Sequence, residues 1–197
     1  MSALVPDTLP FGSIEKKSTG WWGVLCLVAT EACLFGYLLF SYAYAAVTQS
    51  ADWMPPKPPE LTLAAPDTVV LLASSVAVWW GERGMKQGRP RRLLIGYAAG
   101  FVMGLAFVLV QIKEWSQKGY GPAHNGYASN YFIITGFHMA HVIIGLTALA
   151  AILGWGLLGY FDRERNAPVT YASIYWHFVD VVWLFVFSAF YIAPRLG

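Results

Sequence analysis

Charged residues are scarce in this chain, at 12% of its 197 residues against roughly 25% in soluble domains. So few charges cannot cover a globule of this size in water. The net charge of +2 and the lack of basic runs interleaved with aromatics exclude a nucleic-acid surface. The two cysteines, Cys26 and Cys33, lie inside one apolar block. They indicate packing between small apolar residues, and neither a disulfide scaffold nor an oxidising compartment.

Apolar residues are abundant instead, at 57% of the chain with a mean hydropathy of +0.50. They form five blocks, each near the roughly 20 helical residues that cross a bilayer core. The second block is the weakest, because its strictly apolar part covers only Val69–Trp80, so it needs its flanks or tilt to cross. The sequence predicts an all-α bundle, with an N-terminal segment 1–20 and one domain, 21–197. The transmembrane helices are expected at about 21–47, 67–83, 93–115, 130–160 and 171–194.

Lysines and arginines predict the orientation of this bundle. Five crossings place the N-terminus and the second and fourth loops on one side, which holds nine of the thirteen basic residues. Because the cytoplasmic side carries the excess of positive charge, we expect the N-terminus inside and the C-terminus outside. Tryptophans and tyrosines near the block ends are expected to anchor the interfaces. They are Trp21, Trp22, Trp79 and Trp80 on the inner side and Trp115, Tyr120 and Tyr191 on the outer side.

Ionisable side chains inside the apolar blocks are costly in lipid and point to function. Helical rise places most of them near mid-membrane, where they are expected to pair inside the bundle; Glu114 lies nearer the outer end. His138 and His141 share one helix face, as do His177 and Asp180. The expected polar cluster consists of Glu31, Glu114, His138, His141, His177 and Asp180.

A metal site is one interpretation of this cluster, because bundle metal sites use histidines and carboxylates on facing helices. The chain has only four histidines, and a histidine-rich iron or haem site would need more. Hydrogen bonding or proton handling between helices is therefore the favoured interpretation, with no catalytic or metal-binding residue expected in this chain.

Two further patterns have simpler interpretations. Gly96, Gly100 and Gly104 recur every four residues, a spacing that lets another helix pack closely. The basic loop after the second block can contact anionic lipid head groups, although the topology alone explains its charge. Its basic residues are Arg83, Lys86, Arg89, Arg91 and Arg92.

Several stretches resemble cytochrome oxidase subunit III. YFIITGFHMAHVIIG, at 131–145, is similar to the family pattern ATGFHGLHVIIG, and YWHFVDVVWLFVF, at 175–187, is similar to its C-terminal signature. ATEACLFG, at 29–36, resembles the helix with the family's buried glutamate, although Thr30 stands where the family has serine. VVLLASS, at 69–75, and QIKEW, at 111–115, also match in order.

The resemblance implies a non-catalytic subunit of a haem-copper terminal oxidase, in a five-helix form that lacks the first two helices of longer members. It implies packing against subunit I and other oxidase subunits, support of proton uptake, and phospholipid bound in a cleft. Haem and copper would lie in the partner subunits. Glu31 matches the family's carbodiimide-reactive carboxylate, and the other five cluster residues match recurring polar positions. The implied location is the bacterial inner membrane.

Two alternatives stay open. One is an accessory membrane subunit associated with nitric oxide reductase, which would share the fold but have another partner. The other is a stand-alone membrane metalloenzyme that uses the histidine–carboxylate cluster.

Overall fold

Five long helices make up a computed structural model that describes residues 19–49, 53 and 59–195. All five are long and apolar enough to cross a membrane, and every regular element in the described ranges is helical. This confirms the predicted five-helix bundle. The predicted N-terminal segment 1–20 lies outside the described residues up to residue 18. The helices are α1 (Thr19–Thr48), α2 (Leu61–Lys86), α3 (Pro90–Gln117), α4 (Gly126–Leu157) and α5 (Ala167–Phe187).

The second helix is longer than its apolar block. It begins at Leu61 rather than near 67 and passes through Pro66. This proline is exposed and is the sixth residue of the helix, where it removes one backbone hydrogen bond, a loss that transmembrane helices tolerate. The helix ends at Lys86, and Gly88, with a φ of 72°, allows the tight turn into α3. The 26 residues of α2 therefore span the bilayer without special thinning.

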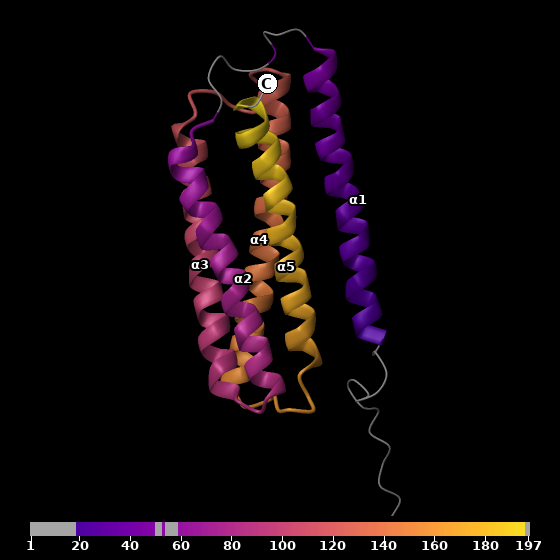
Figure 1. Cartoon of the computed structure of the whole chain (residues 1–197), viewed down its shortest axis with the longest axis vertical. Coiled ribbons are helices and arrows are strands. Elements are labelled where there is room, and N and C mark those ends of the chain that lie inside the picture. The colour runs from indigo at the N-terminus through magenta and orange to yellow at the C-terminus, as the bar shows by residue number, and fades with distance from the viewer. Residues whose placement is uncertain (1–18, 50–52, 54–58, 196–197) are drawn as a thin grey trace, which may run out of the picture.

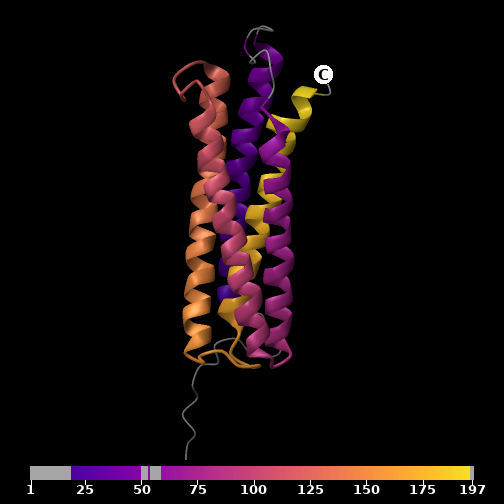
Figure 2. The ribbon, with the colours of Figure 1, turned by 90° about the vertical axis from the view of Figure 1, so that its left-hand side faces the viewer.

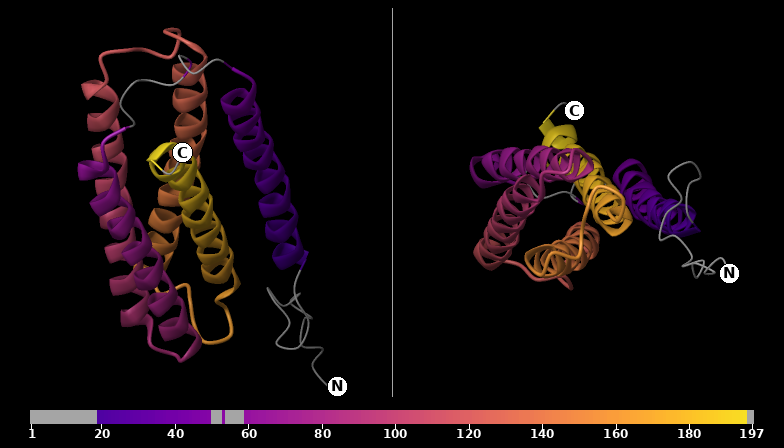
Figure 3. Two further views of the ribbon diagram at one scale, coloured as in Figure 1. Left: turned by 45° about the horizontal axis from the view of Figure 1, so that its top comes forward. Right: turned by 90° about the horizontal axis from the view of Figure 1, so that it is seen from below.

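The helices run along one common axis (Figure 2). Four of them, α2 to α5, pack around a shared core, and α1 stands beside α5 at the edge of this group (Figures 1 and 3). Only Phe35 and Tyr42 of α1 are buried among its residues. Cys26 and Cys33 are exposed free cysteines, because α1 presents most of its surface outward.

Large aromatic side chains of α5 fill the core and connect it to its neighbours. The indole of Trp176 donates to the Ser74 hydroxyl at 3.0 Å, and that of Trp183 donates to Thr68 at 2.9 Å. Tyr97 on α3 donates to the carbonyl of Val169 at 2.8 Å. Because an unpaired polar group is costly in an apolar interior, these bonds fix how α5 faces α2 and α3.

The two ends of the bundle differ in the elements they hold. The basic end holds the start of α1 and the α2–α3 and α4–α5 turns, and the opposite end holds the α3–α4 loop and the end of α5 (Figure 1). At the opposite end α5 widens into a π-helical turn, Ser188–Ile192, followed by the short 3-10 turn Ala193–Arg195. The π turn directs both Phe190 and Tyr191 into the core, where each is fully buried.

Candidate functional site

The predicted polar residues do not form one cluster. The structure divides them among four places: a Glu31–His141 pair, the isolated His138, a polar chain between α2 and α5 that includes His177 and Asp180, and a site around Glu114. Counting residues from the helix ends places most of these residues at similar depths in the membrane, but they lie on different helix faces.

Glu31 of α1 meets His141 of α4, with 3.0 Å between Oε2 and Nε2. His141 Nδ1 lies 2.7 Å from the carbonyl of Phe137, which can only accept, so Nδ1 carries a proton. Contact between Nε2 and the carboxylate then requires one more proton, held either by the imidazole or by Glu31. The pair is a proton-holding site at the α1–α4 contact, with 26% of the Glu31 side chain exposed.

His138 lies three residues before His141 but has other partners. Its Nε2 donates to the carbonyl of Val179 on α5 at 3.2 Å, and its ring packs against Phe107 and Trp183. It is 1% exposed. The geometry is that of a buried histidine that joins α4 to α5.

A chain of polar side chains lies between α2 and α5. His177 contacts the Ser75 hydroxyl through Nδ1 at 2.5 Å and Ser173 through Nε2 at 3.2 Å. Ser173 donates to Glu82 at 2.8 Å, and Thr170 donates to the other Glu82 oxygen at 3.0 Å. At the basic end, Lys86 pairs with Glu82 at 2.6 Å.

Asp180 lies at the inner end of this chain and is 3% exposed. Neither oxygen of its carboxyl group has a hydrogen-bond partner among the described residues, and Ser75 is a polar neighbour. Sequence reasoning missed Glu82, Thr170 and Ser173. The signal was available, because Thr170 and Ser173 continue the face of His177 and Asp180 at spacings of three and four.

Glu114 accepts three donors at the opposite end of the bundle. Its Oε1 lies 2.9 Å from the Tyr131 hydroxyl, 2.6 Å from the Tyr191 hydroxyl and 3.2 Å from Lys118 Nζ. The Lys118 ammonium also lies 4.3 Å from the centre of the Tyr131 ring. Tyr191 is fully buried, so its expected role as an exposed interface anchor is wrong. A second buried carboxyl group nearby, Asp67, was also missed.

The three glycines of α3 lie at close helix contacts. A Cβ on Gly96 would be 2.5 Å from the Ala77 carbonyl oxygen of α2, and one on Gly104 would be 2.5 Å from the Trp176 ring. One on Gly100 would meet Val78 at 2.5 Å. Each glycine therefore occupies a position without room for a side chain.

Basic residues surround the α2–α3 turn. Arg83 lies over the Trp79 ring at 4.4 Å and Arg92 over the Trp80 ring at 5.5 Å. Arg89 and Arg91 are exposed. Together with Lys86, they give this end a positive surface at the depth where lipid head groups would lie.

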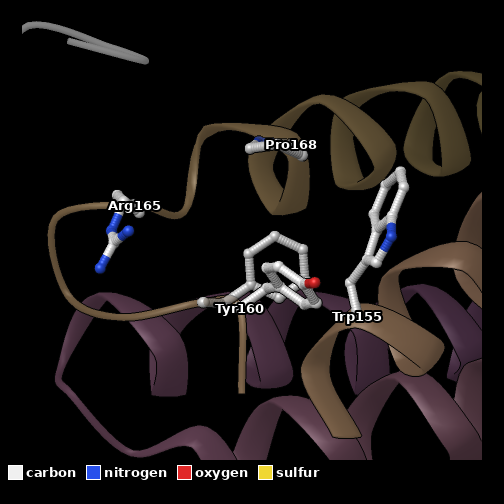
Figure 4. A pocket seen from close by; sticks show the side chains of 5 residues that line it. Trp155, Tyr160, Arg165 and Pro168 are labelled. Atoms are coloured by element: carbon white, nitrogen blue, oxygen red, sulfur yellow. The ribbon is translucent and has the colours of Figure 1, made fainter. Parts of the chain in front are cut away.

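Two neighbouring pockets open near the same end and share Trp155 and Pro168. One, of about 340 Å³, has an apolar lining from α1, α4 and α5, which includes Leu27 and Tyr175. The other, of about 360 Å³, includes Arg165 (Figure 4). Arg165 pairs with Asp162 at 3.0 Å. Backbone N–H groups of Arg165 and Glu164 donate to Asp162 and hold the pKa of its carboxyl group below its usual range.

The side chains that could bind a metal ion lie apart from one another among the residues that the structure describes. In the described part of the chain, no three His, Cys, Asp or Glu side chains are grouped so that they could hold one. The histidine–carboxylate arrangement expected of a stand-alone metalloenzyme therefore does not come together among these residues. Instead, the Glu31–His141 pair links α1 to α4, and His138 links α4 to α5.

Known proteins similar to this chain agree with one another. The family described as cytochrome c oxidase subunit III matches residues 14–194. A protein named cytochrome c oxidase subunit 3 from Myxine glutinosa is 32% identical over 189 residues, 91% of this chain and 71% of the relative. Its namesake from Thermostichus vulcanus is 32% identical over 177 residues, 88% of this chain and 87% of the relative. The Danio rerio protein is also 32% identical, over 86% of this chain and 68% of the relative.

Proposed function

Because the chain belongs to the cytochrome c oxidase subunit III family, we propose that it packs against the catalytic subunit I of a terminal oxidase. As a subunit III it is a multi-pass membrane protein that works in a complex with other oxidase subunits. In this proposal, haem and copper belong to the partners and reduce oxygen with electrons from cytochrome c or quinol. This chain stabilises subunit I and supports its proton uptake.

The observation that carries the proton-uptake part is the Glu31–His141 pair. Hydrogen-bond valence requires one exchangeable proton between these two side chains. The partial exposure of Glu31 leaves that proton within reach of a neighbouring subunit or of water. A histidine–carboxylate pair that holds a proton this way can exchange it without a metal ion.

We assign the basic end to the cytoplasmic side. In the described residues, seven lysines and arginines lie there, and three, Lys113, Lys118 and Arg195, lie at the opposite end. The positive-inside rule then places the start of α1 inside and the end of α5 outside. A bacterial inner membrane fits this assignment.

Bound phospholipid is part of the proposal. The apolar pocket beside α1 is suited to an acyl chain, and the neighbouring pocket with Arg165 is suited to a head group. The Arg165–Asp162 pair is exposed, and exposed ion pairs contribute little stability, so a lipid phosphate can replace Asp162 as the partner.

Purification in a mild detergent tests the assignment of the partner. We expect a haem-containing subunit to co-purify with this chain and the complex to consume oxygen. Co-purification with a complex that reduces nitric oxide and not oxygen would instead support the alternative accessory role. Stoichiometric iron, copper or zinc on the isolated chain would support the metalloenzyme alternative.

Glu31→Gln is expected to leave haem content and assembly intact and to slow proton uptake by the complex. Glutamine keeps the size and can still bond His141, but it cannot hold the shared proton. The measurements are the haem spectrum of the purified complex and proton uptake during turnover. Loss of haem in this variant would contradict a role outside cofactor binding. Thr30→Ala, a change at the neighbouring exposed residue, is the control.

Replacing both Arg89 and Arg91 with glutamine is expected to weaken retention of anionic phospholipid. Each basic residue near an anionic surface contributes about 1 kcal/mol, so the double change corresponds to roughly a thirtyfold loss of affinity. Lipid analysis of the purified complex measures it. The change Lys113→Gln, at the opposite end, is the matched control, and equal lipid content in all three proteins would contradict the head-group assignment.

A further inference from the structure

The polar chain between α2 and α5 follows one face of each helix. On α5 its members are Thr170, Ser173, His177 and Asp180, spaced by three, four and three residues, and on α2 they are Ser75 and Glu82, seven apart. Such spacing keeps side chains on one side of a helix. Over ten residues of α5 this row of polar side chains extends about 15 Å into the bundle from the basic end.

Hydrogen-bond valence gives the chain a direction. The Glu82 carboxylate can only accept, so the Ser173 hydroxyl donates to it. Ser173 must then accept from Nε2 of His177. When the imidazole is neutral, Nδ1 is the acceptor of the Ser75 proton. All three donors point from Ser75 towards Glu82, as in a wire that is ready to pass one proton.

Asp180 is placed to complete this wire. It is almost fully buried, and no described group pairs with its oxygens. An unpaired carboxylate ion is costly at that depth, so the group holds a proton. The Ser75 hydroxyl, which donates to His177, still has lone pairs that can accept that proton.

We propose that this interface is a proton-exchange route that links Asp180 to the water at the basic end, with Glu82 as its entrance. In the outward step, Asp180 gives its proton to Ser75, Ser75 gives its own to His177 Nδ1, Nε2 releases one to Ser173, and Ser173 protonates Glu82. Water then takes the proton from Glu82, next to Lys86. One proton has moved, the imidazole has changed tautomer, and no bond between heavy atoms has changed. Uptake is the reverse.

The route is separate from the Glu31–His141 pair and does not depend on which subunit packs against the chain. It gives the α2–α5 interface a buried proton store that is filled from one side of the membrane. The chemistry needs only side chains of this chain and water.

Hydrogen–deuterium exchange of the Asp180 carboxyl group, followed by infrared spectroscopy of the intact complex, tests the proposal. Asp180→Asn should remove one carboxylic C=O band, and Asp180→Glu should shift it if the asparagine variant does not assemble. In D2O the wild-type band should shift rapidly. Ser75→Ala should slow that exchange by roughly a hundredfold, the lower range of what a positioned proton donor contributes.

Matched variants separate the route from general packing. Ser75→Thr keeps the hydroxyl and should restore fast exchange. Ser74→Ala removes the adjacent hydroxyl, which bonds Trp176 and takes no part in the proton route. In this variant the Asp180 carboxyl group should exchange as fast as in wild type. Wild-type exchange in Ser75→Ala, or an unchanged set of carboxylic bands in both Asp180 variants, would overturn the proposal.

Discussion

Replacing Glu114 with alanine is expected to destabilise the end of the bundle opposite to the basic end by about 3–5 kcal/mol, the usual cost of removing one partner of a buried ion pair. The change takes away the acceptor shared by Tyr131, Tyr191 and Lys118. The lysine side chain is only 10% exposed, so its charge would be left without compensation. Thermal unfolding of the complex and the amount of this chain that it retains measure the effect.

Two further substitutions locate the cause of that loss. Glu114→Gln keeps an oxygen acceptor for the two phenols but loses the negative charge, so its effect should be smaller. Lys113→Ala changes an exposed side chain one residue away and should be close to neutral. If all three variants melted together with wild type, Glu114 would not be the centre that stabilises this end.

Gly96→Ala is expected to force α2 and α3 apart and to lower the amount of assembled complex. The new Cβ would lie 2.5 Å from the Ala77 carbonyl oxygen and 2.8 Å from the Cα of Gly81. Both are backbone atoms and cannot rotate away, so the helices themselves must move. Overpacking of this kind costs about 1–3 kcal/mol. The measurements are thermal unfolding and the yield of complex after mild solubilisation.

Gly154→Ala is the matched control for Gly96→Ala. Gly154 also lies inside a helix, but a Cβ there would have nothing within 4 Å. Its replacement removes a residue of poor helix propensity and should leave stability equal or slightly higher. Equal yields for the two alanine variants would contradict the close contact between α2 and α3 as the reason for glycine at 96.

The number and approximate places of the helices are predictable from the sequence. Lipid requires about 20 apolar residues for each crossing. Four blocks meet that requirement, and the second meets it only with its flanks. The glycine ladder of α3 is also readable, because a spacing of four residues places small side chains on one face wherever the helix packs. These features depend on the local residue pattern and on block length, and both can be read directly from the amino-acid sequence.

The start of α2 and the role of Tyr191 are not predictable in the same way. Pro66 resembles a helix boundary, yet its exposed position in the first turns lets α2 begin at Leu61. Tyr191 resembles an interface anchor, but the π turn after Phe187 directs it to Glu114. In both cases the deciding factor is the direction in which a side chain points after the helices pack.

The sequence by itself determined that Glu31, the histidines and Asp180 enter the membrane, since their positions within apolar blocks follow from counting. It did not single out Glu82 and Asp67, which lie near the two ends of α2. Only the tertiary structure decided how they pair, because neighbouring positions such as His138 and His141 face different helices. The rotation of α5, set by packing around Trp176 and Trp183, places His177 between Ser75 and Ser173. The contact of α1 with α4 joins Glu31 to His141. The membrane depth of a side chain depends on its own helix, whereas the neighbour that it faces depends on how all five helices pack together.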